Sequence, residues 1–228
     1  MEDKIFEFLW KMSLYINKNK LILTDEKDNL TVIDKWIIEK CKVVIKNYLN
    51  YIQNNNIDKA KEVIDDFFRD DYYNLYRLVV DNKIKNNKEY DVSKNVLLNV
   101  YLEILKMYML YYPDIVKFIY GNLYFNSKNL LYNDNLKEYI IDDSVLSFGE
   151  DIKSIILEVC KFRKDANISN KKSIDSVSLN IKKDYIKLLP KSLDDILRLI
   201  NSKNVNIDFS DETYVELIMN DKIIIKKR

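Results

Sequence analysis

Histidine is absent from this chain of 228 residues. Without it, no Ser-His-Asp or Cys-His arrangement, no histidine metal ligand and no histidine general base can exist. The two cysteines, Cys41 and Cys160, are too few for a disulfide framework or for a zinc site of their own. Their scarcity favours a reduced, cytoplasmic setting. We therefore expect no metal and no cofactor.

Glycine is almost as rare, since only Gly121 and Gly149 occur. Neither the Walker loop nor the dinucleotide fingerprint can be written with two isolated glycines, which excludes phosphate binding by those loops. No apolar run approaches the roughly 18 residues that span a bilayer, and the chain opens on an acidic sequence, so we expect no membrane partner. A formal net charge of only +1 also excludes a uniformly polybasic nucleic-acid binder.

What the sequence does contain is apolar residues spaced three and four apart over long stretches, with Asn- and Lys-rich breaks between them. This spacing is typical of amphipathic helices. Asn56 or Asp58 is a candidate cap for the third helix, and Asp91 or Ser93 for the fourth, which Pro113 ends or kinks. The predicted helices cover about residues 2–19, 31–53, 114–123 and 150–166; between the second and third of these ranges, a further helix carries the apolar residues from Ala60 to Val79 and another those from Val96 to Tyr108. The stretch between the helices at 114–123 and 150–166 is predicted to be irregular.

Beyond about residue 170 the period changes. Residues 176–181 alternate polar and apolar, as a half-buried strand does. Pro190 lies near the start of a predicted helix, where its missing N–H costs little, and three further strands are predicted at 205–209, 213–219 and 223–227. The predicted fold is therefore mainly α: an antiparallel helical bundle over residues 1–170, followed by a small mixed α/β appendage over residues 171–228.

Five short motifs occur in an order that resembles the anticodon-binding region of class Ia aminoacyl-tRNA synthetases, the valyl type most closely. Residues 9–15, LWKMSLY, resemble the family's LWNASRF helix, and residues 34–38, DKWII, resemble its DRWIL. Ala60, the run FFRDDY at 67–72 and Tyr76 resemble A…FFWNDF…Y, and YYP at 111–113 with Tyr120 falls where the family has HPFMPF…EELY. Residues 162–169, FRKDANIS, resemble the YKSExNIS segment that leads into a small α/β appendage. The resemblance covers nearly the whole chain.

The resemblance implies a part of a synthetase that is not catalytic by itself. The family activates its amino acid with a HIGH motif, which needs histidine, and with a KMSKS loop. Lys11-Met12-Ser13 matches the start of KMSKS, but it continues as Leu14-Tyr15 inside a predicted amphipathic helix. The chain would act in valine-tRNA ligation only together with a catalytic domain, and a separate synthetase catalytic chain is therefore one partner to consider.

The resemblance also implies tRNA as a partner, bound through its anticodon stem-loop. The aromatic that the family places near the anticodon corresponds to Tyr15, with Lys11 and Lys18 about one turn away on either side. Single-stranded loops are read by stacking on aromatic rings, and their phosphates are held by lysine and arginine. The alternative is that Tyr15 belongs to the core. Leu14 stands where the family has arginine and Lys11 where it has asparagine, which weighs against base reading here.

A second candidate RNA contact is the basic stretch that carries Lys161, Arg163, Lys164, Lys171 and Lys172. Residues 151–187 hold nine Lys/Arg against five Asp/Glu, a local balance of +4. Such a patch could bind phosphates, or it could be a solvated helix end whose cations favour the helix dipole. Trp36, Phe67, Phe68 and Tyr76 are predicted to be core residues. Asp65, Asp66, Asp70 and Asp71 are predicted to form an exposed acidic face beside Arg69 and Arg77, rather than an acid pair for catalysis.

Two functions follow from the sequence. The first is a tRNA-binding module, encoded alone or split from a valyl-type synthetase. The second is a protein-interaction scaffold that kept the helical bundle and lost RNA reading, which the near-neutral net charge of +1 favours.

Overall fold

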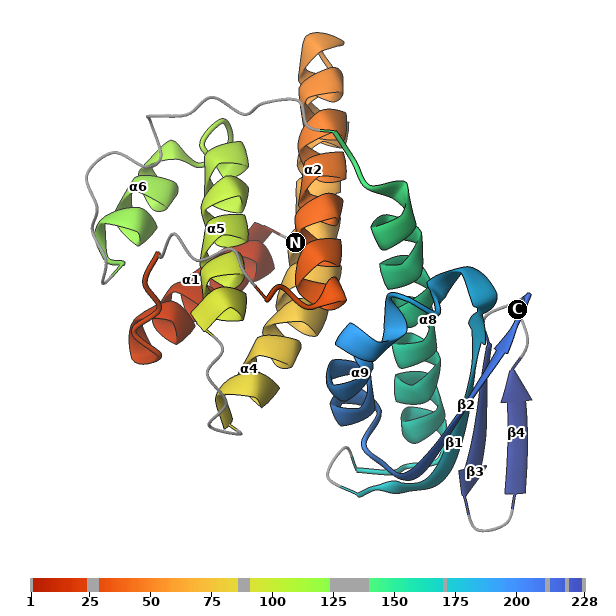
Figure 1. The fold of residues 1–228 in the computed structure, drawn as a ribbon. Coiled ribbons are helices and arrows are strands. Elements are labelled where there is room, and N and C mark those ends of the chain that lie inside the picture. Colours follow the sequence, from red (N-terminus) through yellow and green to blue (C-terminus); the bar gives the residue numbers. More distant parts are fainter. Residues whose placement is uncertain are drawn as a thin grey trace. The chain divides into compact units, whose positions relative to one another are not determined.

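The computed structural model describes residues 2–23, 29–85, 91–123, 140–169, 172–211, 214–219 and 222–226. Contacts divide the chain into two compact units, which we describe separately. Unit 1 comprises Met1–Leu30 and Ile37–Asp142, and unit 2 comprises Thr31–Trp36 and Asp143–Arg228. The fold is mainly α, as predicted, with one small sheet near the C-terminus (Figure 1).

The helices of unit 1 that fall within the described residues follow the predicted order. They are α1 (Glu2–Lys18), α2 (Val32–Gln53, whose first turn groups with unit 2), α3 (Ile57–Asp66), the π-helix η1 (Phe67–Tyr76), α4 (Arg77–Lys85), α5 (Asp91–Tyr108) and α6 (Pro113–Gly121). Pro113 opens α6 at its first turn, where a missing N–H breaks no helical bond. The bounds of α1, α2 and α6 agree with the predicted ranges to within about two residues.

Asparagines mark where these helices stop and start. Asn55 adopts φ 54°, the left-handed conformation that ends α2. The N–H of Asn56 then donates to Tyr51 O at 2.8 Å, as in a Schellman motif, and the side chain of Asn56 accepts from Lys59 N at 3.2 Å to cap α3. Of the two predicted caps, Asn56 is therefore the one that the fold uses. The polar run at 54–56 thus both ends α2 and begins α3.

The third predicted helix, which carries the apolar residues from Ala60 to Val79, is interrupted by the π-helix η1. Its buried residues come in pairs four apart: Phe67-Phe68, Asp71-Tyr72 and Leu75-Tyr76. A repeat of four exceeds the 3.6 residues of an α-turn, and the wider i→i+5 turn keeps all three pairs on the core side. Asp71 is buried with them, so the predicted exposed acidic face is wrong for this residue.

Hydrogen bonds from buried tyrosine hydroxyls connect the helices in the core of unit 1. Tyr72 donates to Leu97 O at 2.7 Å and Tyr101 donates to Leu9 O at 2.8 Å, so that η1, α5 and α1 are joined by buried hydroxyl groups. The Tyr72 and Tyr101 rings are stacked, with centroids 6.3 Å apart. Phe67, Phe68 and Tyr76 are buried, which confirms their predicted place in the core, as is Trp36 in unit 2.

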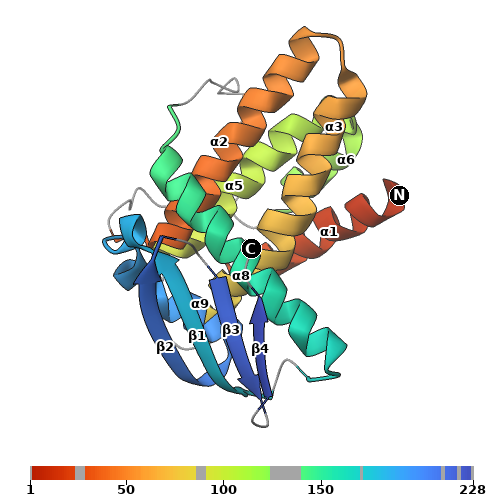
Figure 2. The ribbon, with the colours of Figure 1, turned by 90° about the vertical axis from the view of Figure 1, so that its right-hand side faces the viewer.

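Unit 2 is a four-stranded sheet with helices α8 (Asp143–Asp165) and α9 (Leu193–Ile200). The strands are β1 (Ile174–Lys182), β2 (Ser202–Ser210), β3 (Tyr214–Met219) and β4 (Lys222–Lys226), in the order β2-β1-β3-β4, which Figure 2 shows from left to right. β1 and β2 are parallel, with two short 3₁₀ turns, η2 (Lys183–Tyr185) and η3 (Leu189–Lys191), and α9 in the connection, whereas β1–β3 and β3–β4 are antiparallel. Alternate residues of β1 are buried, as predicted for the strand at 176–181.

The predicted turn at 220–221 lies outside the described residues, as does most of the segment predicted to be irregular, 124–139. Helix α8 begins seven residues earlier than predicted, at Asp143. It groups with the sheet, so the contacts divide the chain at 142/143 rather than at the predicted 170/171. Among the described residues, no helix is long and apolar enough to cross a membrane.

Candidate nucleic-acid interface

Helix α1 presents a basic stripe to solvent. Lys4, Lys11 and Lys18 are seven residues apart and all exposed, so they lie on one face of the helix. Lys11 forms an ion pair with Glu7, one turn earlier. This pair raises the pKa of Lys11 and lowers that of Glu7. The predicted RNA contacts Lys11 and Lys18 are therefore placed on a common, solvent-exposed face. The KMS run belongs to this helix too, with Met12 and Ser13 buried and the Ser13 hydroxyl donating to Trp10 O at 2.8 Å.

Tyr15 is half-buried and turns its hydroxyl inward. The hydroxyl is buried and finds no hydrogen-bond partner in the described part of the chain. Arg77 lies over the ring, 5.8 Å from its centroid. Burial raises the pKa of Tyr15 to about 12, with Asp81 adding to the rise and Arg77 opposing it. A side chain with a buried polar end offers little to a base, so the structure favours the core alternative that the sequence left open.

The exposed aromatic of α1 is Trp10, which was not among the residues predicted from the sequence to bind RNA. Its ring stacks on that of Phe118 from α6, with centroids 5.9 Å apart and planes at 23°. Trp10 is 40% exposed and Phe118 is 61% exposed. The signal was present, because Trp10 falls outside the apolar stripe of Ile5, Leu9, Met12 and Ile16.

The second predicted site, at the end of α8, is only in part a surface patch. Lys161, Lys164 and Lys172 are exposed, and Lys171 lies outside the described residues. Arg163 is 4% exposed and points the other way.

Arg163 is the C-terminal cap of a different helix. Its Nη2 donates to Ile200 O at 2.9 Å and to Asn201 O at 3.0 Å, where α9 ends, and its Nη1 donates to Lys172 O at 2.7 Å and Ser169 O at 3.2 Å. A cation at the carbonyl end of a helix is favoured by the helix dipole. These four bonds occupy both terminal nitrogens of the guanidinium, so Arg163 holds α8, α9 and the start of β1 together and is not placed to bind a phosphate.

The FRKDANIS motif has a structural meaning of its own. Asn167 adopts φ 53°, and Ile168 N donates to Arg163 O at 2.7 Å, which closes the end of α8 in a Schellman motif. The motif therefore ends α8, and the hydrogen bonds of Arg163 connect this helix end to the end of α9. Lys161 and Lys164 are left on the exposed side of the last turns.

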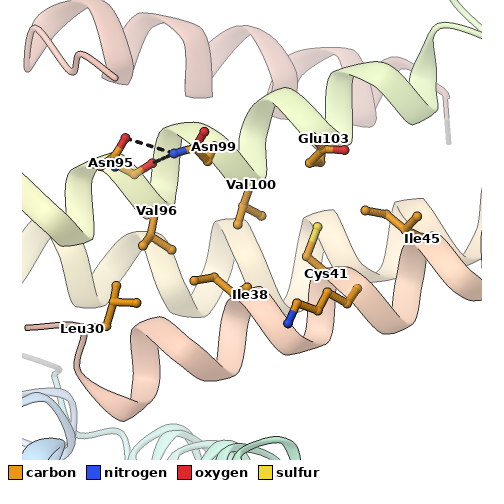
Figure 3. A pocket seen from close by; sticks show the side chains of 10 residues that line it. Leu30, Ile38, Cys41, Ile45, Asn95, Val96, Asn99, Val100 and Glu103 are labelled. Atoms are coloured by element: carbon orange, nitrogen blue, oxygen red, sulfur yellow. Dashed lines mark hydrogen bonds between the residues drawn. The ribbon is translucent and has the colours of Figure 1, made fainter. Parts of the chain in front are cut away.

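A pocket of about 440 Å³ opens between α2 and α5 of unit 1 (Figure 3). It is lined mainly by apolar side chains, and Cys41 reaches into it from α2 (Figure 3). Burial raises the pKa of the Cys41 thiol, so this thiol is a weak nucleophile. The polar groups of the lining are already engaged: Asn99 donates to Asn95 O at 2.9 Å, and Lys42 pairs with Glu39 at 2.7 Å. The pocket shows no catalytic arrangement. The described residues also contain no group of three or more Cys, Asp or Glu that could hold a metal ion.

Comparison with known families decides what this architecture is. The family described as the anticodon-binding domain of tRNA ligase matches residues 34–179, more than half of the chain. The chain belongs to this family. The matched range runs from the start of α2 into β1, so it includes most of the bundle and the α8 end with its exposed lysines.

Relatives extend the likeness on both sides of that range. The chain is 27% identical over 227 residues to the valine–tRNA ligase of Malacoplasma penetrans, which covers 93% of this chain and 25% of the relative. It is 26% identical over 200 residues to that of Buchnera aphidicola subsp. Schizaphis graminum, covering 81% of this chain and 20% of the relative. It is 22% identical over 220 residues to the valine–tRNA ligase of Saccharolobus solfataricus, covering 93% of this chain and 25% of the relative. The chain thus spans a fifth to a quarter of the length of these relatives, and the predicted resemblance to the valyl type is confirmed.

Proposed function

We propose that this chain is a non-catalytic tRNA-binding module that holds the anticodon stem-loop for aminoacylation with valine. The observation that carries the proposal is the match of an anticodon-binding family over residues 34–179, on a chain whose relatives over up to 93% of its length are valine–tRNA ligases. The basic stripe of α1 supplies a surface of the right charge.

The proposed phosphate contacts are the exposed lysines of the two units. They are Lys11 and Lys18 on α1, Lys161 and Lys164 at the end of α8, and Lys172 in the connection before β1; Lys171 remains a contact predicted from the sequence. Lysine side chains neutralise phosphates and release counterions, which gives affinity without sequence information. Tyr15 and Arg163 are left out of the proposed contacts because their polar groups are turned inward.

The chemistry of aminoacylation would come from elsewhere. With no histidine, this chain cannot carry the HIGH motif, and the structure places Lys11-Met12-Ser13 within α1 rather than in a loop. We therefore propose that a catalytic domain, on a separate chain or on a longer form of this one, completes the ligase in the cytoplasm.

The competing function is the scaffold without RNA reading. Leu14, which stands where the family has arginine, is 49% exposed and adds an apolar side chain to the stripe between Lys11 and Lys18. A protein partner would use such a residue, whereas a phosphate would not.

A filter-binding titration with unfractionated tRNA at about 50 mM and about 200 mM salt separates the two functions. The module should bind with submicromolar affinity at the lower salt, and the affinity should fall steeply at the higher salt because each phosphate contact adds to the salt dependence. Double-stranded DNA of equal nucleotide content is the control for charge alone and should bind more weakly. Absence of tRNA binding at the lower salt, together with a homodimer or a bound protein, would establish the scaffold instead.

A further inference from the structure

Two large aromatic rings lie next to each other on the surface of unit 1. Trp10 of α1 and Phe118 of α6 are 108 positions apart in the sequence, yet their rings are nearly parallel, with centroids 5.9 Å apart. They remain 40% and 61% exposed, and Leu14, one turn after Trp10, is 49% exposed beside them in the helix. Covering these rings with a ligand would remove apolar surface from water, which is favourable. An exposed pair of ordered rings therefore indicates a binding surface.

The pair is held in place from both sides. Before it along the helices, Phe6 of α1 meets Tyr112, the cap residue of α6, edge to face, with centroids 4.6 Å apart. After it, Asn17 Nδ2 donates to Asn122 O at 2.7 Å. Along both helices these contacts follow the order of the sequence, from Phe6–Tyr112 through the Trp10–Phe118 pair to Asn17–Asn122. They therefore hold α1 and α6 side by side. A ligand that stacks on the rings would not have to order them first.

The surrounding charge indicates what kind of ligand this is. Among the described side chains of α1 and α6, the exposed charged ones are Lys4, Lys11, Lys18 and Lys117 against Glu7 and Asp114, and the sequence of α1 also carries Glu2 and Asp3 at its start. Lys11 directly follows Trp10, and Lys117 directly precedes Phe118. Aromatic faces interleaved with lysines are the pattern by which proteins hold single-stranded nucleic acid, with bases on the rings and phosphates on the ammonium groups.

We propose that Trp10 and Phe118 form a stacking platform for an unpaired base of the RNA loop that this chain binds. The proposal rests on the proposed tRNA-binding function and deepens it. It places base stacking on the outer face of α1, at Trp10, instead of at Tyr15. Stacking accepts any base, so the platform adds affinity for unpaired nucleotides without selecting among them.

The natural tryptophans allow the platform to be tested without any substitution. The chain has two, and Trp36 is 1% exposed, so a neutral quencher such as acrylamide reaches only Trp10. A 17-nucleotide RNA hairpin with a seven-nucleotide loop should shield Trp10 from the quencher on binding. A fully paired RNA duplex of equal length should bind through its phosphates and leave Trp10 accessible.

A substitution then measures the contribution of the platform. Phe118→Ala should weaken hairpin binding about 5- to 150-fold, which corresponds to the roughly 1–3 kcal/mol that one base-stacking aromatic contributes, and should leave duplex binding unchanged. Phe209→Ala is the matched control, because Phe209 is 39% exposed but lies on β2 of unit 2. Far-UV circular dichroism of both variants checks that they are folded.

The possible outcomes distinguish a failure of the stacking platform from a failure of the proposed tRNA-binding function. A hairpin that binds on filters while Trp10 stays accessible and Phe118→Ala binds as tightly as the parent overturns the platform and leaves tRNA binding standing. A hairpin and tRNA that both fail to bind overturn the function itself. Self-association of the chain that Phe118→Ala abolishes, seen by sedimentation, would show that the pair is a protein interface and would also overturn the platform.

Discussion

Gly149 lies directly against the indole of Trp36. A Cβ atom built at position 149 would come within 1.9 Å of Trp36 Cδ1 and 2.1 Å of Cγ, so the first turn of α2 and helix α8 meet at a distance that only glycine permits. The indole Nε1 donates to Glu150 Oε1 at 3.1 Å, next to this contact. The DKWII motif therefore matters for packing, since it supplies the ring that α8 rests on.

Gly149→Ala should destabilise the chain by about 1–3 kcal/mol, because an inserted methyl group forces the ring or the helix to move. Gly121→Ala is its control, because no atom of the described residues lies within 4 Å of a Cβ at that position. This second substitution should raise stability by about 0.5–1 kcal/mol through the lower backbone entropy of the unfolded chain. Urea unfolding followed by fluorescence measures both. Equal changes in the free energy of unfolding for the two variants would contradict the close contact between Gly149 and Trp36.

Arg163→Met should lower the free energy of unfolding by about 3 kcal/mol, because four carbonyl oxygens lose a charged donor in a buried place. Lys164→Met, at the exposed neighbouring position, should change it by no more than about 0.5 kcal/mol. Thermal unfolding of the two variants gives the comparison. If the two values were alike, Arg163 would be a surface cation as the sequence first indicated.

Tyr15→Phe should raise stability near neutral pH by about 1 kcal/mol, since it removes a buried hydroxyl that has no partner in the described part of the chain. The pH dependence should change as well. An unfolded tyrosine ionises near pH 10, and burial raises the pKa of folded Tyr15 to about 12. The stability that comes from keeping Tyr15 neutral is therefore present below pH 10 and is lost as the pH rises through 12. Unfolding free energies measured across that window should fall less steeply for Tyr15→Phe than for the parent. Parallel curves would mean that the hydroxyl is solvated.

The two cysteines should differ sharply in reactivity. Cys160 is exposed on α8, whereas Cys41 is 4% exposed. Burial raises the pKa of both thiols, more strongly at Cys41, and Arg163 partly opposes the rise at Cys160. At about pH 8 an aromatic disulfide reagent should modify Cys160, and Cys41 should react at least about 100-fold more slowly until the chain is unfolded. Cys160→Ser should then show no fast phase. A fast phase that persists in this variant would mean that α2 and α5 separate readily at the pocket.

Much of the fold was predictable because the apolar spacing of the helices is regular. The polar run at Asn54–Asn56 marked a helix end, and alternation at 176–181 marked a strand, and both are confirmed. The π-helix was not predicted, since a repeat of four residues over ten positions also fits an α-helix when the hydrogen bonds are unknown. The grouping of α8 with the sheet is not visible in the sequence, because it depends on tertiary contacts.

The candidate site was predictable only for the lysines that face solvent. Lys11 and Lys18 share a face because of their spacing, which the sequence contains. Arg163 lies in a basic run, and only the end of α9, thirty-seven residues later, shows that it is a cap. Trp10 could be placed on the exposed face from its helical position, but its neighbour Phe118 comes from a distant helix.

The most direct test of the account is the salt dependence of tRNA binding for two double variants. Lys11→Ala/Lys18→Ala removes two cations from α1, and Lys46→Ala/Lys59→Ala removes two exposed cations from α2 and α3. If α1 is the RNA-binding face, the α1 variant binds tRNA more weakly, with a slope of log affinity against log salt that is smaller by about 2, while the control variant binds like the parent. Equal affinities and slopes for the two variants and the parent would contradict the assignment of α1 as the RNA-binding face.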